Sequence, residues 1–323
     1  MARVSIIIPA YNAEATIAAT IESALKQSHR DLEVVCVDDG SSDRTREIAA
    51  AFAPRVRLIE QPNSGPAAAR NAGARVTSGD YLAFLDADDL WEPRMLERCV
   101  TALDSNPSAT LAFCNAEIAD SEGARLGSVL AGRGFDHAPS LAELLSQMWP
   151  IMVSTAVMRR GAYEKCGGWS EELRGASFRF EDTDFWIRLR GQGPFIYLNE
   201  LLAVWRFALF PAQLKKLPDY SKAPHVFERS LKERYGVSAE PIVRARMRAP
   251  RSILANIGLK ALRAGDRTRA RAAFALAIRI DPYRLKNYMR WLRTFLPRIL
   301  VIRLSGAGGR ATHDSRPAPG GIE

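Results

Sequence analysis

The fold is decided by the stretch Gly79-Asp80-Tyr81-Leu82-Ala83-Phe84-Leu85-Asp86-Ala87-Asp88-Asp89-Leu90-Trp91. Its apolar run over residues 81–85 predicts a buried strand, and three carboxylates follow within four residues. Carboxylates this close repel one another unless water or a cation lies among them. Mg²⁺ and Mn²⁺ prefer carboxylate oxygens and keep positions open for phosphate oxygens. The stretch therefore predicts either a metal–diphosphate site, with Asp88 as the first candidate ligand, or a solvated turn in which Asp89 caps the next helix.

Three strand–turn–helix units precede this stretch. Short apolar segments at 4–9, 32–37 and 56–59 have the composition of buried strands. Helical patterns follow them at 15–27, 44–52 and 67–76. This alternation is typical of an α/β protein with a mostly parallel sheet, in which ligands bind at the carboxyl ends of the strands. We therefore expect the residues that follow the strands to meet at one edge of the sheet: Pro9 and Tyr11, Asp38 and Asp39, Asn63 and Gly65, and Asp86 and Asp88.

The strand-end turns exclude two common phosphate-binding loops, because none has the pattern G-x-G-x-x-G or G-x-x-x-x-G-K-[ST]. A site built from carboxylates instead of glycine amides needs a metal ion to hold a diphosphate. The sequence leaves two possible roles open for each of two residues in these turns. Tyr11 fits stacking on a nucleotide base or covering the end of the sheet. Asp39 fits accepting the N–H of uracil or thymine, or capping the following helix.

Four of these segments, in this order, resemble the motifs of family 2 glycosyltransferases with the GT-A fold. They are VSIIIPAYN at 4–12, VDDGSSD at 37–43, NSGPAAARN at 63–71 and FLDADD at 84–89. The resemblance implies a Rossmann-like GT-A domain, a nucleotide-sugar donor, and a Mg²⁺ or Mn²⁺ ion held by Asp86 and Asp88. It also implies that Asp39 contacts the base and that Arg70 lies near the nucleotide or its diphosphate. The implied donor-binding residues are Pro9, Tyr11, Glu14, Asp39, Asn63, Gly65, Arg70, Asp86 and, from a later segment, Arg206.

A second group of acids, Glu181, Asp182 and Asp184, opens another predicted helix. Acidic side chains in a first helical turn complement the helix dipole, which accounts for some of them without catalysis. Transfer of a sugar to a hydroxyl also needs a general base, because the alcohol loses its proton as it attacks. The stretch resembles the Glu-Asp motif of the same family, which implies that Asp182 is the base with Glu181 beside it. Gly168-Trp169 is similar to that family's Gly-Gly-aromatic turn, so Trp169 and Asp184 are expected on the acceptor side.

One segment departs from the family pattern. Relatives often have an aromatic-Arg-x-His stretch after this helix, and the His can join the metal or diphosphate site. Here residues 204–208 read VWRFA, so Ala208 stands where the His would be. The resemblance therefore implies a phosphate contact for Arg206 but no histidine ligand at that position.

The charge of the chain is uneven. The formal net charge is +9, yet residues 241–310 carry 17 Lys and Arg against 2 Asp and Glu, which leaves the first 240 residues acidic. Such a basic segment favours an anionic partner, which is a membrane surface, an acidic protein or nucleic acid. We expect a catalytic domain over 1–240, a basic helical extension over 241–304 and a disordered tail over 305–323.

The basic extension contains three helical patterns. Segments 253–264 and 267–280 resemble one tetratricopeptide helix pair, which cannot bury its own apolar face and should dock on the body or on a partner. Residues 284–304 combine basic, aromatic and apolar positions. This pattern fits either peripheral binding to an anionic membrane surface or packing on the body. Nucleic-acid binding is a weaker alternative for the same charge.

Composition and cysteine usage bear on the compartment. The hydrophobic and charged fractions, 47% and 25%, are typical of a soluble globular protein. None of the four cysteines forms a C-x-x-C pair, which fits a reducing compartment. No signal peptide is evident, and no apolar run approaches the ~20 residues of a membrane span. We therefore expect a cytoplasmic protein whose membrane contact, if any, is peripheral at the inner face.

Together these features predict an inverting, metal-dependent glycosyltransferase. It would move a sugar from a nucleotide-diphosphate donor, with a lean to UDP, to a hydroxyl of a glycan or lipid-linked acceptor. Cell-envelope or exopolysaccharide synthesis is the expected process. The alternatives are a non-catalytic scaffold that binds sugar nucleotides and a nucleic-acid-binding protein that acts through the basic segment.

Overall fold

The computed structural model describes residues 2–120, 123–129, 135–147, 149–173, 180–206, 225–246, 258–259, 261–262, 265–280 and 285–295. The chain forms two compact units, Met1–Ala249 and Pro250–Glu323. The sequence predicted a boundary after residue 240, and the predicted tail at 305–323 lies outside the described residues, as does Ala208.

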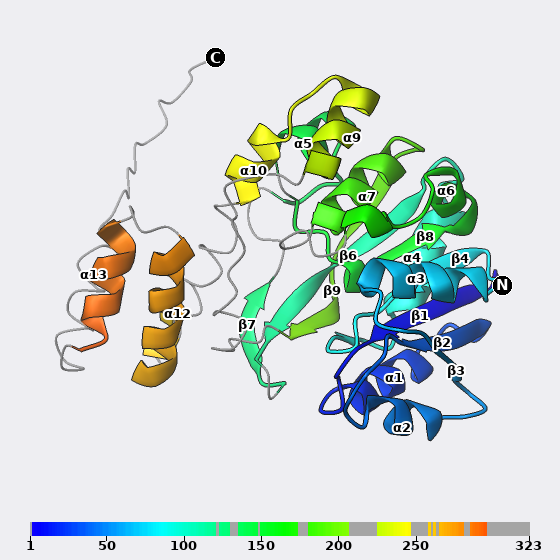
Figure 1. Ribbon diagram of the computed structural model, residues 1–323, viewed down its shortest axis with the longest axis horizontal. Helices are drawn as coiled ribbons and strands as arrows, with labels where there is room; N and C mark the ends of the chain where they lie inside the picture. The colour runs from blue at the N-terminus through cyan, green and yellow to red at the C-terminus, as the bar shows by residue number, and fades with distance from the viewer. Residues whose placement is uncertain are drawn as a thin grey trace, which may run out of the picture. The chain divides into compact units, whose positions relative to one another are not determined.

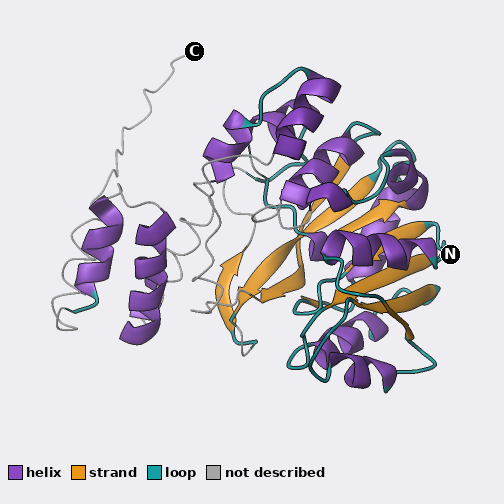
Figure 2. Cartoon of the chain, viewed as in Figure 1, coloured by secondary structure: helices purple, strands orange, loops and turns teal. Residues whose placement is uncertain are grey.

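A sheet of nine strands, counted over the described residues, forms the centre of the first unit (Figure 2). The strands follow the order β3-β2-β1-β4-β8-β6-β9-β5, and β7 pairs with β6. β1 pairs in parallel with β2 and β4, and β2 with β3. β8 is antiparallel to β4 and β6, β9 is parallel to β6, and β5 and β7 are antiparallel to their neighbours, so six of the nine strands share one direction. The strands are β1 Val4–Ala10, β2 Leu32–Asp38, β3 Arg57–Glu60, β4 Tyr81–Phe84, β5 Leu90–Trp91, β6 Leu111–Ala119, β7 Arg125–Val129, β8 Ala156–Arg159 and β9 Phe195–Arg206.

Helices cover both faces of this sheet (Figure 1). Successive side chains of a strand point to opposite faces, so Ile7 of β1 enters one apolar cluster while Ile6 and Ile8 enter the other. Phe185 packs in the first cluster and Met95 in the second. The predicted α/β fold with a mixed, mostly parallel sheet is therefore confirmed. The helices of the first unit are α1 Ile17–Leu25, α2 Thr45–Ala50, α3 Pro66–Arg75, α4 Met95–Asp104, α5 Leu141–Ser146, α6 Arg160–Lys165, α7 Phe180–Arg190, α9 His225–Tyr235 and α10 Glu240–Arg246, with 3₁₀ turns at Val153–Thr155 and Glu171–Leu173.

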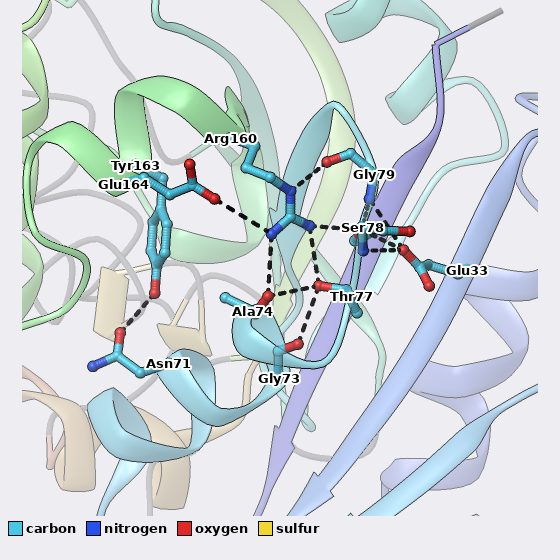
Figure 3. A network of polar contacts seen from close by, with 11 residues as sticks. Glu33, Asn71, Gly73, Ala74, Thr77, Ser78, Gly79, Arg160, Tyr163 and Glu164 are labelled. Carbon is cyan, nitrogen blue, oxygen red and sulfur yellow. Dashed lines mark hydrogen bonds and ion pairs between the residues drawn. The ribbon is translucent and has the colours of Figure 1, made fainter.

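A half-buried arginine, Arg160, holds the segment just before β4 (Figure 3). Arg160 donates from Nε to the carbonyl of Gly79 at 2.5 Å and from Nη1 to the carbonyl of Ala74, the end of α3, at 3.1 Å. Its Nη2 reaches the hydroxyls of Ser5 and Thr77, each at 3.1 Å. One guanidinium thus joins β1, α3 and the start of β4. The acids follow the opposite, carboxyl-terminal end of β4, so they are attached to a strand whose start is held in place.

The second unit contains helices α12, Arg267–Ile280, and α13, Leu285–Arg293. Phe274 of α12 is buried in a small apolar cluster against which Trp291 of α13 packs. Asn287 of α13 donates to the carbonyl of Ala277 in α12 at 3.2 Å. The helix predicted over 253–264 lies only partly within the described residues. Across the described residues, no helix has both the length and the apolar character needed to cross a bilayer.

Candidate active site

The acid loop, residues 85–89 after β4, is held by hydrogen bonds to Ser154. Asp86 is half-buried, Asp88 is exposed and Asp89 is 1% exposed. The Ser154 hydroxyl accepts from the Asp86 amide at 3.1 Å and donates to Oδ2 of Asp89 at 2.5 Å. The backbone N–H of Arg206 donates to Oδ1 of Asp89 at 3.1 Å. Burial raises the pKa of Asp89 well above its ordinary value, and the charges of Asp88 and Asp86 raise it further.

The prediction that Asp89 caps a helix is wrong. The next helix, α4, begins at Met95 with Arg94 at its N-cap, whereas Asp89 ties the loop to β9 and Ser154. Asp86 and Asp88 are therefore the carboxylates of this loop that reach the surface.

Asp86 and Asp88 suit a divalent ion that arrives with a diphosphate. Mg²⁺ is usually held by one or two carboxylates, with phosphate oxygens and water completing its shell. Across the described residues, no group of three or more His, Cys, Asp or Glu side chains gathers as a complete metal site would require. Two acids at an exposed strand end match the partial set that a metal–diphosphate needs, so these residues fit the ion implied by the fold family.

Arg70 of α3 connects the two groups of acids predicted from the sequence. Its side chain is 5% exposed, and Nη2 donates to Oδ1 of Asp86 at 2.7 Å. Nη1 lies 3.7 Å from Oδ1 of Asp182, and the guanidinium lies 4.6 Å above the ring centroid of Trp169. Burial alone would lower the pKa of Arg70, but the Asp86 and Asp182 carboxylates raise it above the ordinary value. The acid loop and the helix-top acids are thereby brought to one place.

Asp182 and Glu181 lie in the first turn of α7, as the sequence predicted. The Asp182 side chain is 13% exposed and Glu181 is half-buried. An acid in a first helical turn is stabilised in its charged form by the helix dipole and here also by Arg70. Asp182 is thus a largely buried carboxylate with a small exposed fraction, and Arg70 lies between it and Asp86.

Trp169 differs from the acceptor-side role predicted for it. Only 2% of the residue is exposed, and its ring stacks on Phe185 with centroids 4.0 Å apart. The indole also meets the edge of Phe84 at 5.6 Å. A large apolar ring between two core phenylalanines gains more from burial than from contact with solvent. Trp169 therefore forms the floor on which Arg70 rests, instead of a wall facing the acceptor.

Asp184 also differs from its predicted acceptor-side position. It is 3% exposed, and Oδ2 accepts from Nε of Arg188 at 2.7 Å while Oδ1 accepts from the hydroxyl of Ser230 at 3.2 Å. Arg188 in turn donates to the carbonyls of Cys166 and Gly168, each at 2.7 Å. Residues four apart lie on one helix face, so Asp184 pairs with Arg188 inside the core. Its carboxylate holds the turn before Trp169 in place.

Asn71 was not assigned a role from the sequence, although it follows Arg70 in the same motif. Its Oδ1 accepts from the hydroxyl of Tyr163 at 2.6 Å, which Figure 3 draws, and from the backbone N–H of Trp169 at 3.0 Å. Its Nδ2 donates to the carbonyl of Trp169 at 2.9 Å and to Oε1 of Glu171 at 2.7 Å. The Arg-Asn motif and the Gly-Trp turn are therefore one structural unit.

The loop after β1 is fastened to the loop after β2. Asn12, at φ +49°, accepts from the Ser42 amide at 2.8 Å, and Oε2 of Glu14 accepts from the Arg44 amide at 3.2 Å. Tyr11 is 53% exposed at this edge, so its ring is open to a planar partner. Glu14, predicted to bind the donor, spends one carboxylate oxygen on the neighbouring loop.

Asp39 holds the loop after β3. Its Oδ1 accepts from the side chain of Gln61 and the amide of Ser64, each at 2.7 Å, and its Oδ2 accepts from the amide of Gly65 at 2.8 Å. Gly65 has φ +90°, a conformation that favours glycine, and is the N-cap residue of α3. Asp39 does not cap α2, whose N-cap residue is Arg44; Asp43, just before it, accepts from the amide of Thr45 at 3.0 Å. The capping interpretation of Asp39 is therefore wrong.

The remaining predicted residues lie around the same edge. Pro9 is buried in β1 opposite Val37, and Asn63 is exposed in the loop that Asp39 holds. A Cβ at Gly40 would lie 2.9 Å from the Asn63 amide, so the loops after β2 and β3 are in close contact. Arg206 ends β9, and its buried Nε and Nη1 atoms have no hydrogen-bond acceptor within the described residues. Unpaired buried donors are the kind of group an anionic ligand satisfies.

Comparisons with known proteins agree with this architecture. Residues 5–167 match the model of the family described as Glycosyl transferase family 2. The chain is 33% identical over 198 residues to the putative glycosyltransferase EpsE of Bacillus subtilis, covering 59% of this chain and 68% of EpsE. It is 33% identical over 201 residues to chondroitin synthase of Escherichia coli, covering 61% of this chain but 28% of that protein. The chain thus spans about a third or less of the length of some of the curated glycosyltransferases that it matches.

Solved structures share the fold at lower identity. TarS 1-349 of S. aureus in complex with UDP-GlcNAc has a TM-score of 0.54 at 18% identity, covering 90% of this chain and 79% of TarS. Mannosyltransferase PcManGT of Pyrobaculum calidifontis, with GDP-Man and Mn²⁺, has a TM-score of 0.54 at 19% identity, covering 95% of this chain and 80% of the other. With the family match over half of the chain and the strand-end acids in place, the chain belongs to glycosyltransferase family 2 and has a GT-A fold.

Proposed function

We propose that the chain transfers a sugar, with inversion, from a nucleotide-diphosphate donor to a hydroxyl of its acceptor. The observation that carries this proposal is the position of Arg70, which contacts Asp86 of the acid loop and Asp182 of α7 with one guanidinium. A donor held at Asp86 and a base at Asp182 would then lie on either side of the Arg70 guanidinium. A hydroxyl beside Asp182 is near the sugar that the donor presents.

Asp182 is the proposed general base. It takes the proton of the acceptor hydroxyl as the oxygen attacks the anomeric carbon from the side opposite the diphosphate. The bond between the anomeric carbon and the diphosphate breaks as the new glycosidic bond forms, which inverts the anomeric configuration. Glu181 would add negative charge beside the oxocarbenium-like carbon, and Arg70, with Nη1 3.7 Å from Oδ1 of Asp182, would help to position the base.

Cationic groups would stabilise the departing diphosphate. Asp86 and Asp88 would hold a Mg²⁺ or Mn²⁺ ion, which supplies positive charge to the leaving group when bound. Support for a divalent ion comes from PcManGT, which was solved with GDP-Man and Mn²⁺. Arg206 would contact the phosphates with the guanidinium donors that lack an acceptor within the described residues.

The donor is proposed to carry uridine. Tyr11 would stack on the base, and Asp39 would accept its N–H at Oδ2, which accepts one hydrogen bond from the loop while Oδ1 accepts two. Pro9, Glu14, Asn63 and Gly65 would shape the surrounding edge. TarS, which shares the fold, was solved with UDP-GlcNAc.

The acceptor is proposed to be a glycan or a lipid-linked sugar in cell-envelope or exopolysaccharide synthesis. The similarity to chondroitin synthase supports a glycan. We place the reaction in the cytoplasm, because all four cysteines are free thiols buried in the fold, as is usual in a reducing compartment.

The test is release of nucleoside diphosphate from a panel of UDP-, GDP- and TDP-sugars with Mn²⁺ or Mg²⁺. We expect turnover with a UDP-sugar and none after chelation of the metal. Turnover restricted to GDP-sugars would refute the uridine assignment. Binding of sugar nucleotides without release from any donor, with every acceptor tried, would support the non-catalytic scaffold instead.

A further inference from the structure

Helix α13 of the second unit has three distinct faces. At 3.6 residues per turn, each residue advances about 100° around the axis. Asn287 and Thr294 fall on one face and are 1% and 0% exposed. Asn287 faces α12, where it donates to the carbonyl of Ala277, and the hydroxyl of Thr294 donates to the carbonyl of Trp291. This inner face accounts for how α13 is held in its unit.

A second face is apolar and open. Leu285, Met289 and Leu292 are 72%, 50% and 57% exposed, and Tyr288 and Phe295 are 37% and 51% exposed. Their spacings of three, four and seven residues place them within about a third of the helix circumference. Phe295 also contacts the ring of Trp291 and the guanidinium of Arg271. Burial of large apolar side chains stabilises a small unit, so a patch in which Leu285, Met289 and Leu292 stay open is costly unless something covers it.

The third face is basic and borders the apolar one. Lys286, Arg290 and Arg293 follow one another at spacings of three and four residues, and residues 285–295 contain no Asp or Glu. Residues 241–310 as a whole carry 17 basic against 2 acidic side chains. The partner that fits this helix therefore combines negative charge with an apolar interior, and the two must lie side by side.

We propose that α13 is an interfacial membrane helix that binds the surface of an anionic lipid bilayer. Leu285, Met289 and Leu292 enter the boundary between headgroups and acyl chains, with Tyr288 and Phe295 at its edge. Lys286, Arg290 and Arg293 extend their charged ends to the lipid phosphates while their stems cover apolar surface. The proposal concerns only the second unit and needs no donor or acceptor, so it stands or falls separately from sugar transfer.

A bilayer fits these observations better than nucleic acid does. Nucleic acid is bound mainly by basic side chains at phosphates, and such binding gives no reason for five exposed apolar side chains beside them. An acidic lipid surface offers both the negative potential and the apolar layer beneath it.

The experiment is co-sedimentation of the full chain with vesicles. One set contains phosphatidylcholine only, and the other contains about one third phosphatidylglycerol. We expect binding to the anionic vesicles, weakened by salt, and little binding to the neutral ones. Leu285→Gln/Leu292→Gln should lower partitioning at least about tenfold, because two apolar side chains no longer enter the boundary. Arg290→Gln/Arg293→Gln should lower it by a similar factor for anionic vesicles alone.

Matched controls come from the first unit. Leu201→Gln changes a leucine that is 46% exposed, and Arg44→Gln/Arg46→Gln changes two exposed arginines. These variants should bind like the parent chain, and thermal unfolding should confirm that all variants are folded. Absence of binding to anionic vesicles would overturn the proposal, as would retention on duplex DNA without vesicle binding. Loss of binding in the arginine variant but not in the leucine variant would overturn the insertion of the apolar face.

Discussion

The Nη2 atom of Arg70 lies 2.7 Å from Oδ1 of Asp86, and the same guanidinium rests on the ring of Trp169. Only a planar, forked cation satisfies both neighbours at once, since it donates in its plane and stacks through its face. With 5% of the Arg70 side chain exposed, water cannot replace either contact. Because Arg70 rests on Trp169 and contacts both acids, its position sets where Asp86 and Asp182 lie relative to one another.

Replacing Arg70 by lysine should lower kcat/KM about 100-fold, because an ammonium group cannot reach both acids while lying on Trp169. Steady-state kinetics with the preferred donor measures this. The control is Arg98→Lys. Arg98 lies on α4 and pairs with Glu200 of β9, away from the site. Equal activity of the two variants would mean that the Arg70 bridge is not used in the reaction.

Replacing Asp182 by asparagine should lower kcat by about 10²- to 10⁴-fold, since the amide cannot take the acceptor proton. Calorimetric titration should find unchanged affinity for the nucleoside diphosphate. Glu172→Gln, at an exposed acid close in sequence, serves as the control and should keep full activity. If the Asp182 variant loses nucleotide binding instead, this residue belongs to the donor site and another group is the base.

Replacing Asp88 by asparagine should raise the Mn²⁺ concentration needed for half-maximal nucleotide binding by about tenfold or more. Binding of UDP is measured with and without Mn²⁺, so the result does not depend on turnover. Asp31→Asn changes an acid that is 44% exposed beside Arg3 and should leave the metal response unaltered. Identical metal titrations of the Asp88 variant and the parent would remove Asp88 from the proposed metal site.

Replacing Asn71 by alanine removes four hydrogen bonds to Tyr163, Trp169 and Glu171. The free energy of unfolding should fall by about 2–4 kcal/mol, because partners of the lost amide are left unsatisfied. Denaturant unfolding measures this fall. Asn106→Ala, which removes one exposed hydrogen bond to the carbonyl of Ala102 just after the end of α4, should cost far less. A loss in the Asn71 variant no larger than in the control would show that the turn is held by other contacts.

The loop around His137 should respond to pH in two directions. Hydrogen bonds to Glu143 and Asp136 raise the pKa of His137 above its ordinary value. This stabilisation is complete below the ordinary histidine pKa and is lost as pH rises through the raised one. Hydrogen bonds from Ser140 and His137 lower the pKa of Glu143 to about 2, so its contribution is lost only as pH falls toward that value.

Thermal midpoints recorded from acid to mildly alkaline pH test this behaviour. His137→Gln should remove the loss seen on the alkaline side and leave the acid limb, which comes from carboxylates, largely in place. An unchanged alkaline limb in this variant would assign that limb to another group.

Strands β1 to β4 were predictable to within one or two residues because each apolar run is bounded by polar turns. The strand at 81–84, the helix at 66–75 and the acids at the top of α7 follow from such local patterns. Strand β9 was not predicted, since Asn199 and Glu200 interrupt its apolar pattern where the register with β6 shifts. A bulge of this kind depends on the partner strand, which local sequence does not specify.

Side-chain partners were less predictable than elements. Asp184 and Trp169 carry the residue types of a binding site, yet both are buried by contacts with Arg188 and Phe185. Ser154 has no local signal at all, since a lone serine in an apolar segment is common. Its role comes from the distance between β4 and the turn before β8, which only the assembled sheet defines.

The three hydrogen bonds that Asp39 accepts from residues 61–65 have a consequence for engineering donor specificity. A loop transplanted from a homologue into this position must present the same amide donors and keep a glycine at 65. Otherwise the chimera buries an uncompensated carboxylate. Position 39 and residues 61–65 therefore have to be exchanged together.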